Sequence, residues 1–182
     1  MPIQADVAAL LAQLPERMPE LPVDPRRKLP VPVVSQHGDF HDFTAINAEQ
    51  GVRLAQERRC SICSGDLGYW VAFLGGEQSF QRRGYADPPM HPACAEASLT
   101  LCPHIRLQRA RRASENHVMA GATTGEGWVE AKPQRWVLGI TRSYDIRMTA
   151  ARGGGHAPVF RPAPFKSHRV FGYDQNGLIT EL

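Results

Sequence analysis

Residues 88–96 read PPMHPACAE, and residues 58–65 read RRCSICSG. The first stretch separates His91 from Cys94 by two residues, and the second separates Cys60 from Cys63 by the same interval. Structural zinc sites use four cysteine and histidine side chains arranged as a tetrahedron. An interval of two residues lets a tight turn, or the first turn of a helix, direct both side chains at one ion. The two pairs therefore predict a Cys3His site with zinc as the cofactor.

Two other interpretations of these residues remain open: a redox-active Cys60–Cys63 pair, or four unrelated buried side chains. A redox CxxC pair usually sits at the start of a helix in a strand–helix–strand unit. Here turn residues and the strand-like YWVAFL at 69–74 follow instead. Cys102 lies eight residues beyond Cys94, which is about 12 Å along a helix. We expect it to be a small buried side chain outside the site, with His104 a surface or core histidine.

The composition fits a globular chain with many turns. It has 182 residues, 42% of them hydrophobic, with 16 glycines and 15 prolines, and a chain of this length suits one domain. Its apolar runs are far shorter than the roughly 20 residues of a membrane helix. The first 20 residues lack the pattern of a secretion signal. These features predict a cytoplasmic protein with reduced thiols and no membrane association, and in reduced proteins paired cysteines more often bind metal.

The pattern along the chain predicts an α+β fold with an antiparallel sheet and a few helices. Helices are expected at 5–14, at 48–58, where Asn47 and Gln50 suggest a capping box, and at 92–101. Extended segments are expected as a strand–turn–strand over 31–46, then at 69–74, as a strand pair or one long strand at 135–148, and in a tail with a hairpin turn at 174–177. A glycine-containing loop is expected at 75–88. We predict one small zinc-stabilised domain, 1–182, with a zinc module at about 58–103 and a β-rich part at about 135–182.

The order of knuckle, strand, loop and helix start resembles the treble-clef zinc finger, in which a zinc knuckle and the first turn of a helix share one ion. A wider set of motifs reads LPERM at 14–18, LPVD at 21–24, CSIC at 60–63, PPMHPACAEASLTLCP at 88–103 and ITRSY at 140–144. In this order the chain resembles a family of short bacterial and phage-associated proteins with no assigned activity. Such proteins have glycine after the second cysteine of the knuckle, where this chain has Ser64. The resemblance implies the zinc ligands and a compact domain, and it implies no substrate.

Charge is distributed unevenly along the chain. Residues 1–100 carry 9 Lys and Arg against 12 Asp and Glu, and residues 101–182 carry 12 against 6, so the halves are −3 and +6. A basic half permits contact with nucleic acid, and it is equally consistent with a solvated surface. The candidate nucleic-acid contacts are Arg106, Arg109, Arg111 and Arg112; of these, Arg106, Arg109 and Arg112 recur every three residues, which suits one face of a helix.

Other polar groups are weaker candidates. His37 and His41 flank a glycine turn and are interpreted as part of a polar hairpin, and Tyr144, Asp145 and Arg147 as alternating residues of a strand. Four protein ligands leave zinc no open position, which favours a structural ion. The sequence thus favours a non-catalytic zinc-binding protein with a macromolecular partner, nucleic acid ahead of protein. A protein–protein adaptor and a small metal-dependent nuclease of HNH type are the alternatives, although residues 64–90 contain no histidine to serve such a nuclease.

Overall fold

The computed structural model describes residues 14–15, 17–38, 40–41, 45–108, 132–151 and 154–182. Its described part is α+β with antiparallel sheets and few helices, as the sequence predicts. The strands are β1 Gln36–His37, β2 Phe40–His41, β3 Val71–Gly76, β4 Trp136–Thr141, β5 Tyr144–Ala150, β6 His156–Pro162, β7 Ser167–Tyr173 and β8 Ile179–Glu181. The helices are α2 Ala48–Gln56, α3 Glu77–Arg82, α4 Pro92–Leu101 and α5 Pro103–Arg106, with 3-10 turns η1 Met18–Glu20 and η2 Val33–Ser35.

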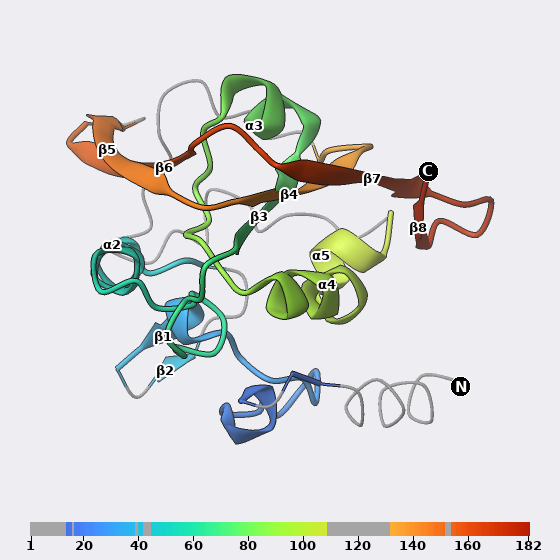
Figure 1. The fold of residues 1–182 in the computed structure, drawn as a ribbon. Coiled ribbons are helices and arrows are strands. Elements are labelled where there is room, and N and C mark those ends of the chain that lie inside the picture. The colour runs from blue at the N-terminus through green and yellow to red at the C-terminus, as the bar shows by residue number, and fades with distance from the viewer. Residues whose placement is uncertain (1–13, 16, 39, 42–44, 109–131, 152–153) are drawn as a thin grey trace.

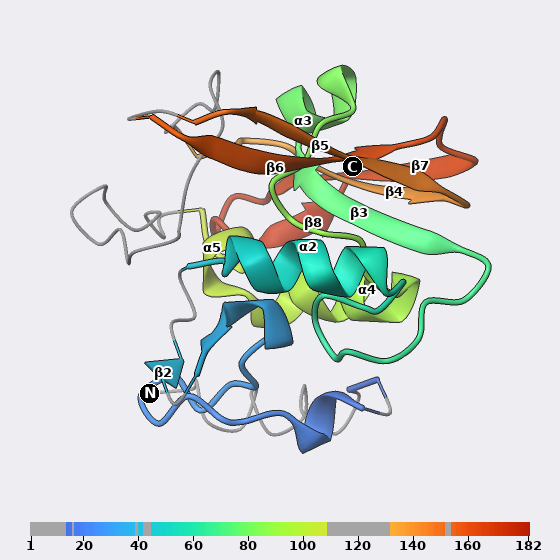
Figure 2. The same cartoon turned by 90° about the vertical axis from the view of Figure 1, so that its left-hand side faces the viewer.

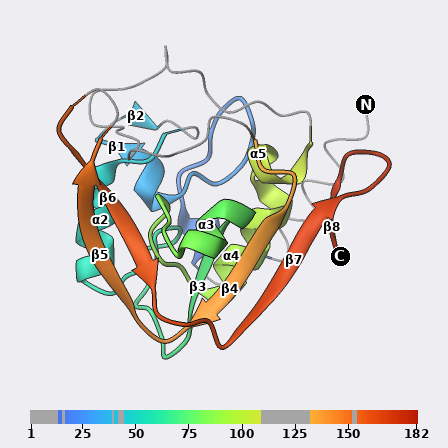
Figure 3. The same ribbon diagram turned by 90° about the horizontal axis from the view of Figure 1, so that it is seen from above.

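The principal sheet joins distant parts of the chain. Its order is β3-β4-β7-β8, and all three pairings are antiparallel. Along the chain, strand β3 lies between the Cys60–Cys63 pair and the His91–Cys94 pair. The β-rich C-terminal part therefore continues a sheet that starts beside the candidate zinc ligands. Strands β5 and β6 form a separate ribbon, and Figure 3 shows this ribbon and the β4–β7 pair as two arms that meet where β4 is followed by β5.

The elements form layers. Figures 1 and 2 show the strands β3 to β8 above a helical layer of α2, α4 and α5, with the N-terminal segment beneath. Strand β3 is buried on both faces, and Phe73 and Phe160 are fully buried. Polar contacts connect the layers as well. The Tyr144 hydroxyl of β5 donates to the Ala55 carbonyl of α2 at 2.8 Å, and the Tyr173 hydroxyl of β7 donates to the Ile105 carbonyl of α5 at 2.9 Å.

The two predicted helices that fall within the described residues are present. Helix α4 has the predicted bounds. Pro92 favours a helix start at this position, because its φ is already close to the helical value. Helix α2 ends at Gln56, two residues before the predicted end. Asn47 caps it by accepting a hydrogen bond from the Gln50 amide at 3.0 Å. The Gln50 side chain donates to the Val33 carbonyl instead of closing the predicted capping box. The helix expected at 5–14 falls almost entirely outside the described residues.

The segment after the knuckle differs from its prediction. The strand begins at Val71 rather than Tyr69, and Gly75 and Gly76 are part of it rather than a loop. A side chain at Gly75 would meet the Tyr85 ring at 2.8 Å, and one at Gly76 would meet Pro133 at 2.6 Å. The glycines therefore permit close packing instead of a turn. Helix α3, with its C-cap in the left-handed region at Arg83, follows where a loop is expected.

The C-terminal strands follow the prediction with one refinement. Residues 135–148 form β4 and the start of β5, which break at Arg142–Ser143 and join different sheets. The turn at 174–177 is a hairpin turn between β7 and β8, with Gly177 at a φ of 72°. Asp174 stabilises it by accepting hydrogen bonds from the amides of Asn176 and Leu178. The strand–turn–strand expected over 31–46 is reduced to the short pair β1–β2.

Candidate metal centre

The structure brings Cys60, Cys63, His91 and Cys94 together. Their ligand atoms all lie within 4.8 Å of one another, and the three cysteines are at most 5% exposed. Sulfur atoms bound to zinc at about 2.3 Å are about 3.8 Å apart at tetrahedral angles. The cluster would therefore need to contract by no more than about 1 Å to surround an ion. This donor set can hold a metal ion, and its three sulfurs and one nitrogen favour thiolate-binding metals such as zinc, copper(I) or iron over Mg²⁺ and Ca²⁺.

The first pair is positioned by a tight knuckle after α2. The Cys60 amide donates to the Gly65 carbonyl at 2.8 Å, and the Ser64 amide donates to the Cys60 carbonyl at 2.9 Å. Ser64 has a φ of 55°, a left-handed conformation that glycine adopts most easily. The turn thus keeps its left-handed residue although the chain has serine there. A Cβ at Gly65 would lie 3.2 Å from His91 Cε1, so this glycine lets the knuckle approach the histidine closely.

The second pair is positioned by the start of α4. His91 is the N-cap residue, and Cys94 lies in the first helical turn, so both side chains face the knuckle. The preceding residues are attached to the first pair: the Ser61 amide donates to the Pro89 carbonyl at 3.1 Å. Met90 and Ala72 exchange two backbone hydrogen bonds, which align this segment along β3. The partial positive charge at the helix start stabilises an anionic sulfur at Cys94.

The His91 ring is oriented toward the sulfurs by a backbone carbonyl. Nε2 lies 2.9 Å from the Asp66 carbonyl oxygen, which can only accept, so Nε2 carries the proton. Nδ1 is then unprotonated, and it lies 3.4 Å from Cys63 Sγ and 3.8 Å from Cys94 Sγ. Metal-binding histidines almost always donate their other N–H in this way. The Asp66 carbonyl is a supporting group that the cysteine and histidine spacing does not reveal.

The thiols perturb one another because they are crowded. Hydrogen bonds from the Cys63 and Cys94 side chains lower the pKa of Cys60 to about 3. Hydrogen bonds to Cys60 and Cys63, together with burial, raise the pKa of Cys94. The Cys60 thiolate therefore forms easily, and a thiolate at Cys94 is opposed by the charge already present. A divalent cation between the sulfurs removes this opposition, which is the electrostatic argument for a metal here.

No protein-family model matches this chain, and no curated protein or solved structure matches it either. The resemblance to short bacterial and phage-associated proteins gains no support from these comparisons.

Cys102 and the remaining histidines lie outside this cluster. In the part of the chain that the structure describes, no other group of three or more His, Cys, Asp or Glu side chains is close enough to hold an ion. Cys102 is half-buried at the N-cap of α5, as predicted for a side chain outside the site, and burial raises the pKa of its thiol. The His104 ring packs edge-on against Trp136 at 5.6 Å. Buried ring nitrogens of His37 and His41 on the β1–β2 pair have no hydrogen-bond partner among the described residues.

Of the four predicted arginine contacts, Arg106 alone falls within the described residues. Arg106 lies at the end of α5 and is half-buried, while Arg109, Arg111 and Arg112 fall outside the described residues. The alternating strand interpretation of residues 144–147 is correct, because Asp145 and Arg147 are exposed and form a 3.6 Å ion pair. The described helices include none that is long and apolar enough to cross a membrane.

A large cavity lies next to the cluster, because Ile62 and Met90, which are direct neighbours of cluster residues in the chain, line it. It encloses about 1130 Å³ between α3, α5, the start of β4 and the N-terminal segment, and none of the four cluster residues lines it. Tyr85, Met90, Leu101 and Trp136 contribute apolar wall, and Lys132 is among the basic residues at its margin. Its volume is sufficient for a small organic molecule.

Proposed function

We propose that this protein is a non-catalytic zinc protein in which Cys60, Cys63, His91 and Cys94 hold one structural Zn²⁺. The observation that carries this proposal is the buried Cys3His cluster with an oriented histidine. Four protein ligands complete the tetrahedron and leave no position for a reacting water or substrate. Three thiolates with Zn²⁺ carry a net charge of −1, which the start of α4 helps to stabilise.

The ion would connect elements that lie apart along the chain. Cys60 and Cys63 follow α2, His91 and Cys94 begin α4, and β3 and α3 lie between the two pairs. This arrangement supports a treble-clef-like module, with the knuckle and the first helical turn sharing the ion. Because metal binding requires the folded arrangement, its free energy stabilises the fold directly. The module would then be the part of the chain that fixes β3, on which the C-terminal sheet is built.

The partner class we propose is nucleic acid, because residues 101–182 carry a net charge of +6. Binding of this kind weakens steeply with salt and needs no added Mg²⁺ or Mn²⁺. A requirement for such an ion, with hydrolysis of the nucleic acid, would identify the nuclease alternative instead.

Metal content and thiol reactivity test the structural zinc. Elemental mass spectrometry of the purified protein is expected to give one zinc per chain. A thiol reagent is expected to count three more cysteines after chelation than before, because Cys60, Cys63 and Cys94 are released together and Cys102 is not a ligand. Iron in place of zinc, or no change in thiol count on chelation, would contradict the proposal and reopen redox chemistry at Cys60 and Cys63.

A further inference from the structure

Two large aromatic side chains are exposed directly after the zinc knuckle. Tyr69 is 63% exposed and Trp70 is 37% exposed, whereas the next residue, Val71, is fully buried at the start of β3. The two rings contact edge-on with their centroids 5.0 Å apart. The sequence YWVAFL suggests a single buried strand, and only the structure separates its exposed beginning from its core.

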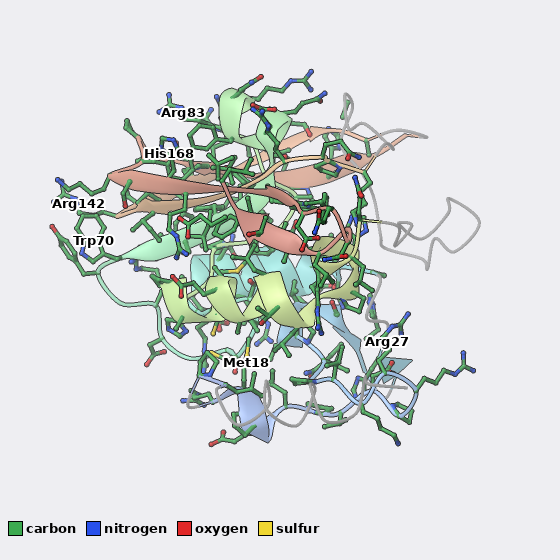
Figure 4. All side chains as sticks on the ribbon, turned by 90° about the vertical axis from the view of Figure 1, so that its right-hand side faces the viewer. Met18, Arg27, Trp70, Arg83, Arg142 and His168 are labelled. Atoms are coloured by element: carbon green, nitrogen blue, oxygen red, sulfur yellow. The ribbon has the colours of Figure 1, made fainter. Side chains whose placement is uncertain are left out.

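An arginine completes this surface. Val71 pairs with Thr141, the last residue of β4, in an antiparallel register. Arg142, the residue after Thr141, therefore lies beside Trp70, the residue before Val71. The Arg142 guanidinium lies 5.5 Å from the Tyr69 ring centroid and 5.9 Å from that of Trp70, and it donates a hydrogen bond to the Tyr69 hydroxyl. Figure 4 shows Trp70 and Arg142 side by side at one edge of the molecule. No described carboxylate lies within ion-pair distance of Arg142. We call Tyr69, Trp70 and Arg142 the aromatic–arginine patch.

Other cations lie around the aromatic–arginine patch. Exposed Arg58 donates to the carbonyl of Gly68, the residue immediately before Tyr69. Exposed Lys166, whose amide donates to the Ile140 carbonyl, lies at the same end of the sheet. The acidic residue nearest to the aromatic pair in sequence is Asp66, which is exposed. A second exposed carboxylate, Asp145, lies three residues after Arg142 and pairs with Arg147. The three cations Arg58, Arg142 and Lys166 outnumber these two carboxylates, a balance that complements an anion.

This combination of groups selects among ligands. Arg142 already lies over both rings, so a cationic ligand such as a methylated amine would be repelled from them. An anionic ligand with flat rings suits both the cations and the aromatic rings of this surface, because its phosphates contact the cations and its bases stack on the aromatic side chains. Bases in a duplex are stacked on each other and present no free face, so unpaired bases suit the aromatic–arginine patch better.

We propose that the aromatic–arginine patch binds single-stranded nucleic acid, with a base stacked on Trp70 or Tyr69 and a phosphate contacting Arg142. This inference rests on the proposed function, since it names the site and strand type for a non-catalytic zinc protein. The knuckle supports the patch directly: the Leu67 amide donates to the Arg58 carbonyl at 2.8 Å, which fixes the start of the segment that carries the two rings.

The test is fluorescence anisotropy of a labelled 15-nucleotide dT strand at low salt, compared with a labelled duplex of equal length. Trp70→Ala and Arg142→Gln are each expected to weaken binding to the single strand by about tenfold. Arg53→Gln is the matched control, because it removes an equal charge from an exposed arginine on α2 that pairs with Glu57. The control is expected to bind within about twofold of the parent protein, consistent with the small energy of an exposed ion pair.

Several outcomes would overturn the inference. They are unchanged binding in Trp70→Ala and Arg142→Gln, an equal loss in Arg53→Gln, tighter binding of the duplex, or no binding of either nucleic acid. Capture of an acidic peptide such as poly-glutamate, lost in Trp70→Ala, would identify a protein partner instead. Zinc content is measured on every sample. Zinc with binding of the duplex but not of the single strand defeats this inference alone. Zinc with binding of neither nucleic acid also defeats the proposed partner class, and strand binding without zinc defeats the structural-metal proposal alone.

Discussion

Replacing Cys94 with serine is expected to remove the metal and the folded state together. The substitution leaves three ligands. At the start of α4 it replaces an anionic sulfur that can bind the metal with a hydroxyl that binds metal weakly. Structural zinc contributes roughly 10–16 kcal/mol of apparent binding free energy in small zinc domains. A domain of this size has about 5–15 kcal/mol of net stability. We therefore expect Cys94→Ser to show no cooperative thermal transition by circular dichroism and no bound zinc.

Cys102→Ser provides the matched control for this experiment. Cys102 is the fourth cysteine of the chain, it lies on the same helical segment, and it is half-buried outside the cluster. Its substitution is expected to retain one zinc and to lower the melting temperature by only a few degrees, in line with about 1 kcal/mol. A Cys94→Ser protein that melts cooperatively near the parent temperature would show that the cluster has no structural role.

Replacing Gly139 with alanine is expected to destabilise the principal sheet by about 1–3 kcal/mol, as overpacking of a core does. Gly139 lies in β4 opposite Phe73, and a Cβ there would meet the Phe165 ring at 2.5 Å. That ring has little freedom to withdraw, because it stacks on Phe80 at 5.2 Å and contacts Tyr85 edge-on. Urea denaturation, followed by tryptophan fluorescence, measures the change in unfolding free energy.

A second pair of variants locates the cause of this loss. Gly68→Ala is the control, because a Cβ at Gly68 would meet nothing within 4 Å, and its effect is expected to stay within about 0.5 kcal/mol. Phe165→Leu removes the edge of the ring that obstructs position 139. If the obstruction is real, the double variant Gly139→Ala, Phe165→Leu should be more stable than the sum of the single effects predicts. Simple additivity would place the strain elsewhere.

The candidate metal residues and their helix could be predicted because their signals are local. Two CxxC-like intervals and a proline at the first helical position act within a few residues, and the structure brings the four side chains together at those positions. The left-handed Ser64 is consistent with the knuckle that the spacing implies. The Asp66 carbonyl that orients His91 could not be predicted, because a backbone carbonyl has no sequence signature.

The features that the sequence does not predict depend on contacts between residues far apart in the chain. In sequence, Gly75 and Gly76 suggest a turn. In the structure they are strand positions with no room for a side chain, because Tyr85 and Pro133 pack directly against the backbone there. The β-like pattern over 135–148 allows either a strand pair or one long strand, and it does not reveal that β4 and β5 join different sheets. Large aromatic side chains in a strand-like segment suggest core residues. Tyr69 and Trp70 are exposed because β3 starts only after them, and the sequence does not show where that start lies.

The position of the four candidate ligands along the chain has a consequence for biosynthesis. All four precede residue 95, and β4, which covers one edge of the wholly buried strand β3, begins at Trp136. The interval from Cys94 to Trp136 is 136 − 94 = 42 residues, or about 2–8 s of translation at 5–20 residues per second. The emerging chain can therefore capture its ion before its sheet partner exists. We expect zinc starvation during expression to move the protein into inclusion bodies, and starvation after synthesis to leave it soluble; equal soluble yields under both regimes would contradict this order.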